Sequence, residues 1–131
     1  MQYIMIGAAG MVGALLRFFL GIGVNGIWEE PFPVATLLAN LIGSFTLGFV
    51  TMYLFQLKKV QGVMATTIGT GLIGSFTTFS TFSVETVALI RDSHYFEAFL
   101  YAVISLVGGL FMAWAGYLSG RHLYNRRKGE G

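Results

Sequence analysis

The chain has 131 residues, of which 55% are hydrophobic and 11% are charged, and its formal net charge is +2. Soluble domains carry about 25% charged residues, so this composition argues against a water-soluble protein and leaves no room for a soluble catalytic domain. The chain also lacks cysteine, which excludes disulfides and thiol chemistry.

The charged residues are separated by long uncharged stretches, at residues 31–57, 60–84 and 98–120. Because about 20 apolar residues carry a helix across the hydrocarbon core, each stretch is long enough to span a bilayer. The sequence therefore predicts an all-α membrane protein with one domain over residues 1–131. We expect four transmembrane helices, near residues 2–24, 33–57, 62–90 and 96–122.

The first predicted span is not a cleavable signal peptide, because no basic segment precedes it and its apolar run continues past any cleavage site. It holds one charge, Arg17, which either reaches an interface by snorkelling or lies in an aqueous vestibule. Trp28 in the following connection suits the membrane interface. Pro33 predicts the start of the second helix, because proline fixes φ and lacks a backbone donor.

Asn40 lies midway along the uncharged second span. Polar groups inside a bilayer are costly and mark candidate functional positions. An amide offers two donors and an acceptor. Asn40 therefore either joins two helices by hydrogen bonds or faces an anion.

The third span contains a hydroxyl-rich segment, Thr-Thr-Phe-Ser-Thr-Phe-Ser, from Thr77 to Ser83. One interpretation is an unbroken helix whose hydroxyls bond to carbonyls four residues earlier. The other is a broken helix whose free carbonyls line a cavity or coordinate an ion, with Gly74 lowering the cost of the break. Phe79 and Phe82 share one helix face, where they serve as packing or turn their positive ring edges toward an anion.

The fourth span places two hydroxyls, those of Tyr101 and Ser105, on one helix face. Glu85 is the acidic residue inside the third span and, like the first-span arginine, either snorkels or borders a vestibule. No Cys/His cluster or nucleophile–base pair is evident, and His94 and His122 sit at span ends. The sequence therefore predicts no enzyme activity.

Small residues recur at helix-packing spacing in the first three spans, as expected where membrane helices approach closely. The glycines concerned are Gly7, Gly10, Gly13, Gly43, Gly48, Gly69, Gly71 and Gly74.

Four spans place both termini and the second connection on one side of the membrane. The basic residues of that side are Lys58, Lys59, Arg121, Arg126, Arg127 and Lys128. The other side carries only Arg91. Lysine and arginine concentrate on the cytoplasmic side, so we expect cytoplasmic termini. The basic tail is interpreted as a contact with lipid headgroups, and no nucleic-acid partner is expected.

Three segments carry a family resemblance. They are Gly-Ala-Leu-Leu-Arg-Phe at 13–18, Thr-Leu-Leu-Ala-Asn-Leu-Ile-Gly-Ser-Phe at 36–45, and Gly-Ser-Phe-Thr-Thr-Phe-Ser-Thr-Phe at 74–82. The third is the most specific and is followed by Ser-Val-Glu at 83–85. In this order, over essentially the whole chain, the sequence resembles the Fluc fluoride channels of the CrcB family.

The resemblance implies a channel that passively exports cytoplasmic fluoride across the cell membrane, here the inner membrane of a prokaryote. It implies an antiparallel, dual-topology dimer with two pores at the subunit interface and a break in the third helix. Backbone carbonyls matching Gly74 and Thr77 would hold a structural sodium ion at the dimer centre. Arg17 would lie in a vestibule. The residues matching the fluoride pore are Asn40, Phe79, Ser80, Thr81, Phe82, Glu85, Tyr101 and Ser105.

The chemistry of fluoride agrees with that assignment. Fluoride holds its water tightly, so a pore must replace this water with close donors. Neutral amide, hydroxyl and ring-edge groups can do so, whereas a fixed cation in the pore would hold the ion too firmly to release it. Chloride is larger, and we expect the narrow path to exclude it.

The charge distribution departs from the family picture, because a subunit that inserts both ways should carry nearly balanced Lys and Arg. One alternative is that the tail charges have little effect on membrane orientation and the chain forms homodimers. The other is that the chain pairs with a separate homologue of opposite orientation. The intact pore motifs favour the homodimer.

Two rival functions are open. A small four-helix multidrug exporter needs a carboxylate in its first span, where this chain has Arg17. A non-transporting scaffold subunit leaves the hydroxyl-rich segment, the phenylalanine pair and Asn40 without a reason to occur together.

Overall fold

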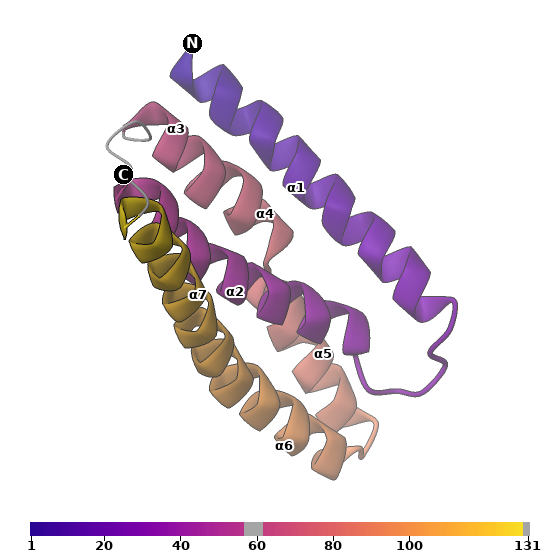
Figure 1. Ribbon diagram of the computed structural model, residues 1–131. Coiled ribbons are helices and arrows are strands. Elements are labelled where there is room, and N and C mark those ends of the chain that lie inside the picture. The colour runs from indigo at the N-terminus through magenta and orange to yellow at the C-terminus, as the bar shows by residue number, and fades with distance from the viewer. Residues whose placement is uncertain (57–61, 130–131) are drawn as a thin grey trace.

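The computed structural model describes residues 1–56 and 62–129, and the chain there forms four helical rods (Figure 1). Each rod is long and apolar enough to cross a membrane, so the chain is a multi-pass all-α membrane protein. The first two rods are α1 (Gln2–Asn25) and α2 (Val34–Gln56). The third consists of α3 (Val63–Thr66), the π-helix η1 (Thr67–Ile73), α4 (Gly74–Phe76) and α5 (Phe79–Arg91). The fourth consists of α6 (Tyr95–Val103), the π-helix η2 (Ile104–Gly108) and α7 (Gly109–Gly129).

The predicted spans agree with these rods at most ends. The predicted end of the second span at residue 57, and Lys58 and Lys59 after it, lie outside the described residues. The helix of the fourth rod continues past the predicted end of the fourth span at residue 122, because α7 ends at Gly129. Its last turns contain Arg126, Arg127 and Lys128, which favour the helical state and interact well with the negative end of the helix dipole.

Both termini lie at the same end of the bundle as the end of α2 and the start of α3 (Figure 1). The α1–α2 connection and the turn between α5 and α6 lie at the opposite end. This arrangement confirms that both termini share an end with the flanks of the second connection. Which end faces the cytoplasm stays a prediction from the charge distribution.

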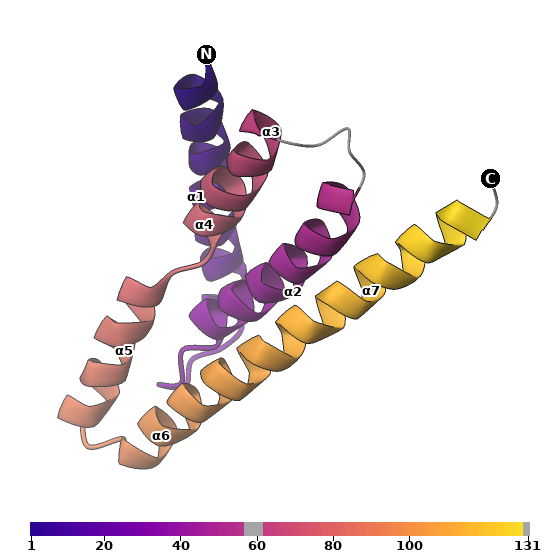
Figure 2. The same cartoon turned by 90° about the vertical axis from the view of Figure 1, so that its left-hand side faces the viewer.

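The third rod is broken between α4 and α5, as the resemblance implies (Figure 2). Thr77 (φ −80°, ψ 157°) and Thr78 (φ −153°, ψ 120°) both have extended backbones. Gly74 does not itself leave the helix, because its φ of −63° and ψ of −30° are helical. The break therefore lies at the threonine pair, inside the hydroxyl-rich segment to which the broken-helix interpretation assigned it.

Close backbone contacts hold α2 against α7 and α1 against the first half of the third rod. A Cβ on Gly48 would collide with the carbonyl of Ala113, and one on Gly116 would collide with that of Phe45. On the other side, a Cβ on Gly13 would meet the carbonyl of Leu72. These contacts confirm the packing role expected for Gly13 and Gly48. Gly7 and Gly69, in contrast, have no neighbouring atom within 4 Å of an added Cβ.

Substituting Gly116→Ala should destabilise the fold by about 1–3 kcal/mol, because the methyl group must push α2 away from α7. Unfolding in detergent micelles, followed by circular dichroism, measures the loss. Gly23→Ala is the matched control, since nothing lies within 4 Å of its added Cβ. A helical alanine there should be neutral or slightly stabilising. Equal effects of both substitutions would contradict close α2–α7 packing.

Candidate functional site

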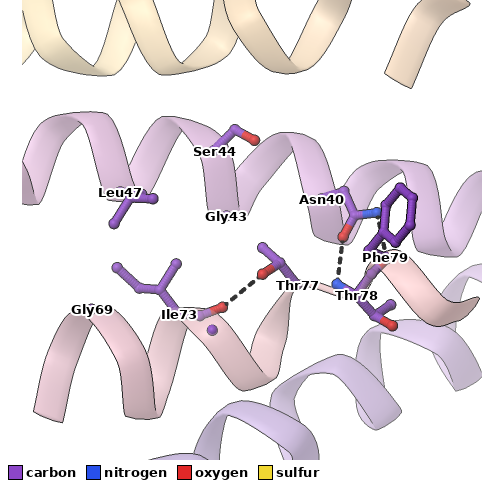
Figure 3. A pocket seen from close by; sticks show the side chains of 10 residues that line it. Asn40, Gly43, Ser44, Leu47, Gly69, Ile73, Thr77, Thr78 and Phe79 are labelled. Carbon is purple, nitrogen blue, oxygen red and sulfur yellow. Dashed lines mark hydrogen bonds between the residues drawn. The ribbon is translucent and has the colours of Figure 1, made fainter. Parts of the chain in front are cut away.

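The side chain of Asn40 on α2 forms hydrogen bonds with the backbone at the break in the third rod (Figure 3). Its Oδ1 accepts a hydrogen bond from the backbone N–H of Thr78 at 2.8 Å, and its Nδ2 donates to the Thr78 carbonyl at 3.0 Å. One amide thus satisfies both main-chain groups of a residue that has left the helix. The helix-joining interpretation of Asn40 is confirmed. Its Nδ2 carries a second hydrogen, which has no acceptor among the described residues.

The same break leaves the last carbonyls before α5 without their usual helical donors, those of Gly74 and Thr77 among them. In a continuous helix the N–H of Thr78 would bond to the Gly74 carbonyl and that of Thr81 to the Thr77 carbonyl. Here the Thr78 N–H goes to Asn40, and the Thr81 N–H goes to the Thr78 Oγ1 at 3.2 Å. The carbonyls of Gly74 and Thr77 are therefore available to another partner.

Hydroxyls in this segment also bond back along the helix, as the unbroken-helix interpretation predicted. Thr77 Oγ1 donates to the Ile73 carbonyl at 3.1 Å, and Ser83 Oγ donates to the Phe79 carbonyl at 3.0 Å. These bonds occur on both sides of the break rather than across it. Thr78 is instead the N-cap of α5, where its side chain accepts from Thr81.

A hollow of about 320 Å³ lies beside the break (Figure 3). It brings together the sequence-predicted residues Asn40, Gly74, Thr77 and Phe79. The Phe79 ring is 79% exposed, so one wall of this hollow is not covered by its own chain. The remaining lining residues are Gly43, Ser44, Leu47, Gly69, Ile73 and Thr78.

A second polar group forms around Glu85 on α5. Thr36 Oγ1 donates to Glu85 Oε1 at 2.9 Å, and the Tyr101 hydroxyl donates to Oε2 at 2.8 Å. Both carboxyl oxygens therefore accept bonds from neutral hydroxyls. A hollow of about 220 Å³ is lined by Arg17, Thr36, Thr81 and Glu85 among others. Within the described part of the chain, Arg17 and Glu85 border this hollow without forming an ion pair.

A row of aromatic rings links the two groups. The centroids of Phe79 and Phe82 are 5.8 Å apart, and those of Phe82 and Tyr101 are 4.9 Å apart. Tyr101 has no exposed surface. Phe79 and Phe82 therefore share a helix face, as predicted. Phe79 is exposed, whereas Phe82 packs against the core.

Two predicted site residues, Ser80 and Ser105, make few or no hydrogen bonds among the described residues. Ser80 is exposed, and its Oγ lies 3.4 Å from the Thr78 hydroxyl. Ser105 lies in η2, where its Oγ is buried and has no hydrogen-bond partner among the described residues. The structure therefore does not join Ser105 to the Glu85 group.

Sequence reasoning did not single out Thr36 or the main chain of Thr78. Thr36 could have been found, because it lies one helical turn before Asn40 and so shares its face of α2. The role of Thr78 depends on an extended backbone, which leaves no distinct side-chain signal. Within residues 1–56 and 62–129, no group of three or more His, Cys, Asp or Glu side chains could hold a metal ion.

A comparison with protein families matches residues 4–117 to the family described as CrcB-like protein, Camphor Resistance (CrcB). The chain belongs to this family. The match covers all four rods of the CrcB-like fold up to Tyr117 in α7. The break, the Asn40 contact and the Glu85 group therefore all lie inside the family region.

Curated relatives of this CrcB-like chain are named as channels. Fluoride-specific ion channel FluC 1 of Bacillus cereus is 50% identical over 129 residues, covering 98% of this chain and 90% of the relative. A second FluC 1, from Desulfitobacterium hafniense, is 48% identical over 82% of this chain and 92% of its own. Fluoride-specific ion channel FluC 2 of Geobacillus kaustophilus is 40% identical over the whole of both chains.

Replacing Asn40 with alanine should destabilise the fold, because the N–H of Thr78 loses its partner and the Thr78 carbonyl loses one of its donors. Each unsatisfied buried group costs about 1–3 kcal/mol. Ser44→Ala is the matched control one turn further along α2, since Ser44 lines the same hollow without a hydrogen bond among the described residues. Thermal unfolding in detergent should show a clear loss for Asn40→Ala and a change within about 0.5 kcal/mol for Ser44→Ala. Equal stability of the two variants would argue against the Asn40–Thr78 pairing.

Proposed function

We propose that this CrcB-family chain is a fluoride-selective channel that passively exports fluoride from the cytoplasm. The names of its curated relatives support this function. The observation that carries the proposal is that the second amide hydrogen of Asn40 has no acceptor among the described residues, while Asn40 and the exposed Phe79 line the same open hollow. The proposed location is the plasma membrane, which in a prokaryote is the inner membrane.

Fluoride would meet neutral donors along this path. The second hydrogen of the Asn40 amide, the hydroxyls of Ser80 and Thr81, and the edges of Phe79 and Phe82 each offer weakly positive groups. Such groups replace the water that fluoride loses on entry without holding the ion as firmly as a fixed cation would. The hydroxyl of Ser105, buried without a hydrogen-bond partner among the residues that the structure describes, is available as a further donor.

Glu85 is a carboxyl group beside a proposed anion path. The hydroxyls of Thr36 and Tyr101 each donate to one of its oxygens, so each oxygen already accepts one hydrogen bond from the protein. Arg17, in the hollow that Glu85 also borders, would attract anions into the vestibule from its aqueous end.

A sodium ion at the dimer centre fits the available groups. Hard cations prefer oxygen ligands, and unwound backbone carbonyls coordinate sodium in membrane proteins. The carbonyls of Gly74 and Thr77 have lost their helical donors to side chains, so they would hold the ion together with the same groups of a second subunit. The ion would supply a fixed positive charge that binds carbonyls from the broken third rods of both subunits.

An antiparallel dimer would complete the site. Phe79 is exposed, and one wall of its hollow is uncovered. A second subunit would cover both. If that subunit had the opposite orientation, the break in its own third rod would lie at this surface. We propose a homodimer, with a heterodimer of this chain and an oppositely oriented homologue as the alternative. The excess of Lys and Arg on one side favours the heterodimer, whereas the complete set of pore residues in this one chain favours the homodimer.

The function is tested by fluoride efflux from liposomes that contain only this purified protein, measured with a fluoride electrode. Valinomycin-dependent fluoride release without chloride release is the expected result, because the path is narrow and the transport electrogenic. Efflux from one chain type alone would establish the homodimer. Release only after adding an oppositely oriented homologue would establish the heterodimer. Absence of release in both cases would contradict the channel.

Phe82→Ile should reduce fluoride efflux to near the level of protein-free liposomes, because isoleucine has no positive ring edge for the ion. Assembly, followed by size-exclusion chromatography in detergent, should be retained. Val84→Ile, on the exposed face of the same helix, is the control and should conduct normally. Unchanged efflux in Phe82→Ile would remove Phe82 from the proposed path.

A further inference from the structure

In the connection between α1 and α2, the ring of Phe32 packs against the core of the bundle. Phe32 precedes Pro33 in this connection, and its carbonyl accepts a hydrogen bond from Trp28 Nε1 at 3.1 Å. Its ring meets that of Tyr101 edge-on, with centroids 5.6 Å apart and planes at 74°. An irregular segment at the end of the bundle is thus anchored at its main chain and packed at its side chain.

Tyr101 stands between Phe32 and Phe82. It is fully buried, its ring lies 4.9 Å from that of Phe82, and its hydroxyl donates to Glu85. Because Tyr101 packs against the Phe82 ring and donates to Glu85, a change in the orientation of Tyr101 alters its contacts with both residues. Phe32 is the ring on the side of Tyr101 away from the break.

Phe32 lines a hollow of about 380 Å³ at this end of the bundle, whereas its contact partner Tyr101 does not line it. Trp28, Glu85 and Asp92 line this hollow with Phe32. Removing the Phe32 ring would extend the hollow to Tyr101 and leave that ring without support on one side. Tyr101 could then turn away from Phe82.

We propose that Phe32 is a positioning residue for the anion path: through Tyr101 it holds the ring of Phe82 in its working orientation. The effect on conduction rests on the proposed fluoride channel, whereas the effect on the orientation of Phe82 does not. No contact between Phe32 and the ion is required.

The orientation of Phe82 is followed by ¹⁹F NMR of the full-length protein carrying 4-fluorophenylalanine at position 82. Phe32→Ala should shift or split this resonance, because the Phe82 ring then occupies more than one orientation. Phe32→Tyr keeps the ring and should restore the original signal. Phe99→Ala, which removes an exposed ring from the same helix as Tyr101, should leave it unchanged. An unchanged resonance in Phe32→Ala, or the same change in Phe99→Ala, would overturn the proposal.

Fluoride efflux from liposomes is measured on the same Phe32 and Phe99 variants with the natural Phe82. Phe32→Ala should lower the rate about 2- to 10-fold, which corresponds to the loss of one edge-to-face contact, and Phe32→Tyr should recover it. A shifted resonance with wild-type efflux would overturn the role of Phe32 in conduction. If the wild-type protein itself releases no fluoride, the proposed function fails, and the resonance alone still decides whether Phe32 positions Phe82.

Discussion

The double hydrogen bond between Asn40 and Thr78 is the contact on which the rest of this structure depends. A bilayer offers no water to backbone groups, and each unsatisfied one costs several kcal/mol there. The amide of Asn40 supplies an acceptor and a donor to the residue that leaves the helix, which makes an extended backbone tolerable inside the span. The free carbonyls of Gly74 and Thr77, and the outward position of Phe79, follow from that break.

The pairing requires α2 to lie at a fixed depth and distance from the third rod. Lipid tails give membrane helices little hydrophobic reason to associate, so backbone contact at small residues provides the attraction. Gly48 and Gly116 let α2 approach α7, and Gly13 lets α1 approach η1. Asn40 is thereby held opposite Thr78 by packing on both sides of the site.

Two groups of polar atoms within the spans, one at the break and one around Glu85, differ in their chemistry. At the break, Asn40, Gly74 and Thr77 line an open hollow. Further along, Glu85 receives two hydroxyl donors and shares a hollow with Arg17. The rings of Phe79, Phe82 and Tyr101 connect them, so the orientation of one ring affects the next. A fluoride path along these groups would pass from a charged mouth to neutral donors.

The sequence alone determined the four spans and the shared end of the termini, because uncharged stretches of sufficient length have few alternatives in a bilayer. The family motifs also identified Asn40, the phenylalanine pair and a broken third helix. Only the tertiary structure decided where in the hydroxyl-rich segment the helix breaks, at Thr77 and Thr78, because a side chain on another helix satisfies the freed backbone there. The partners of Glu85 and the contact of Phe32 with Tyr101 likewise emerged only from the fold, because they join residues far apart in the chain.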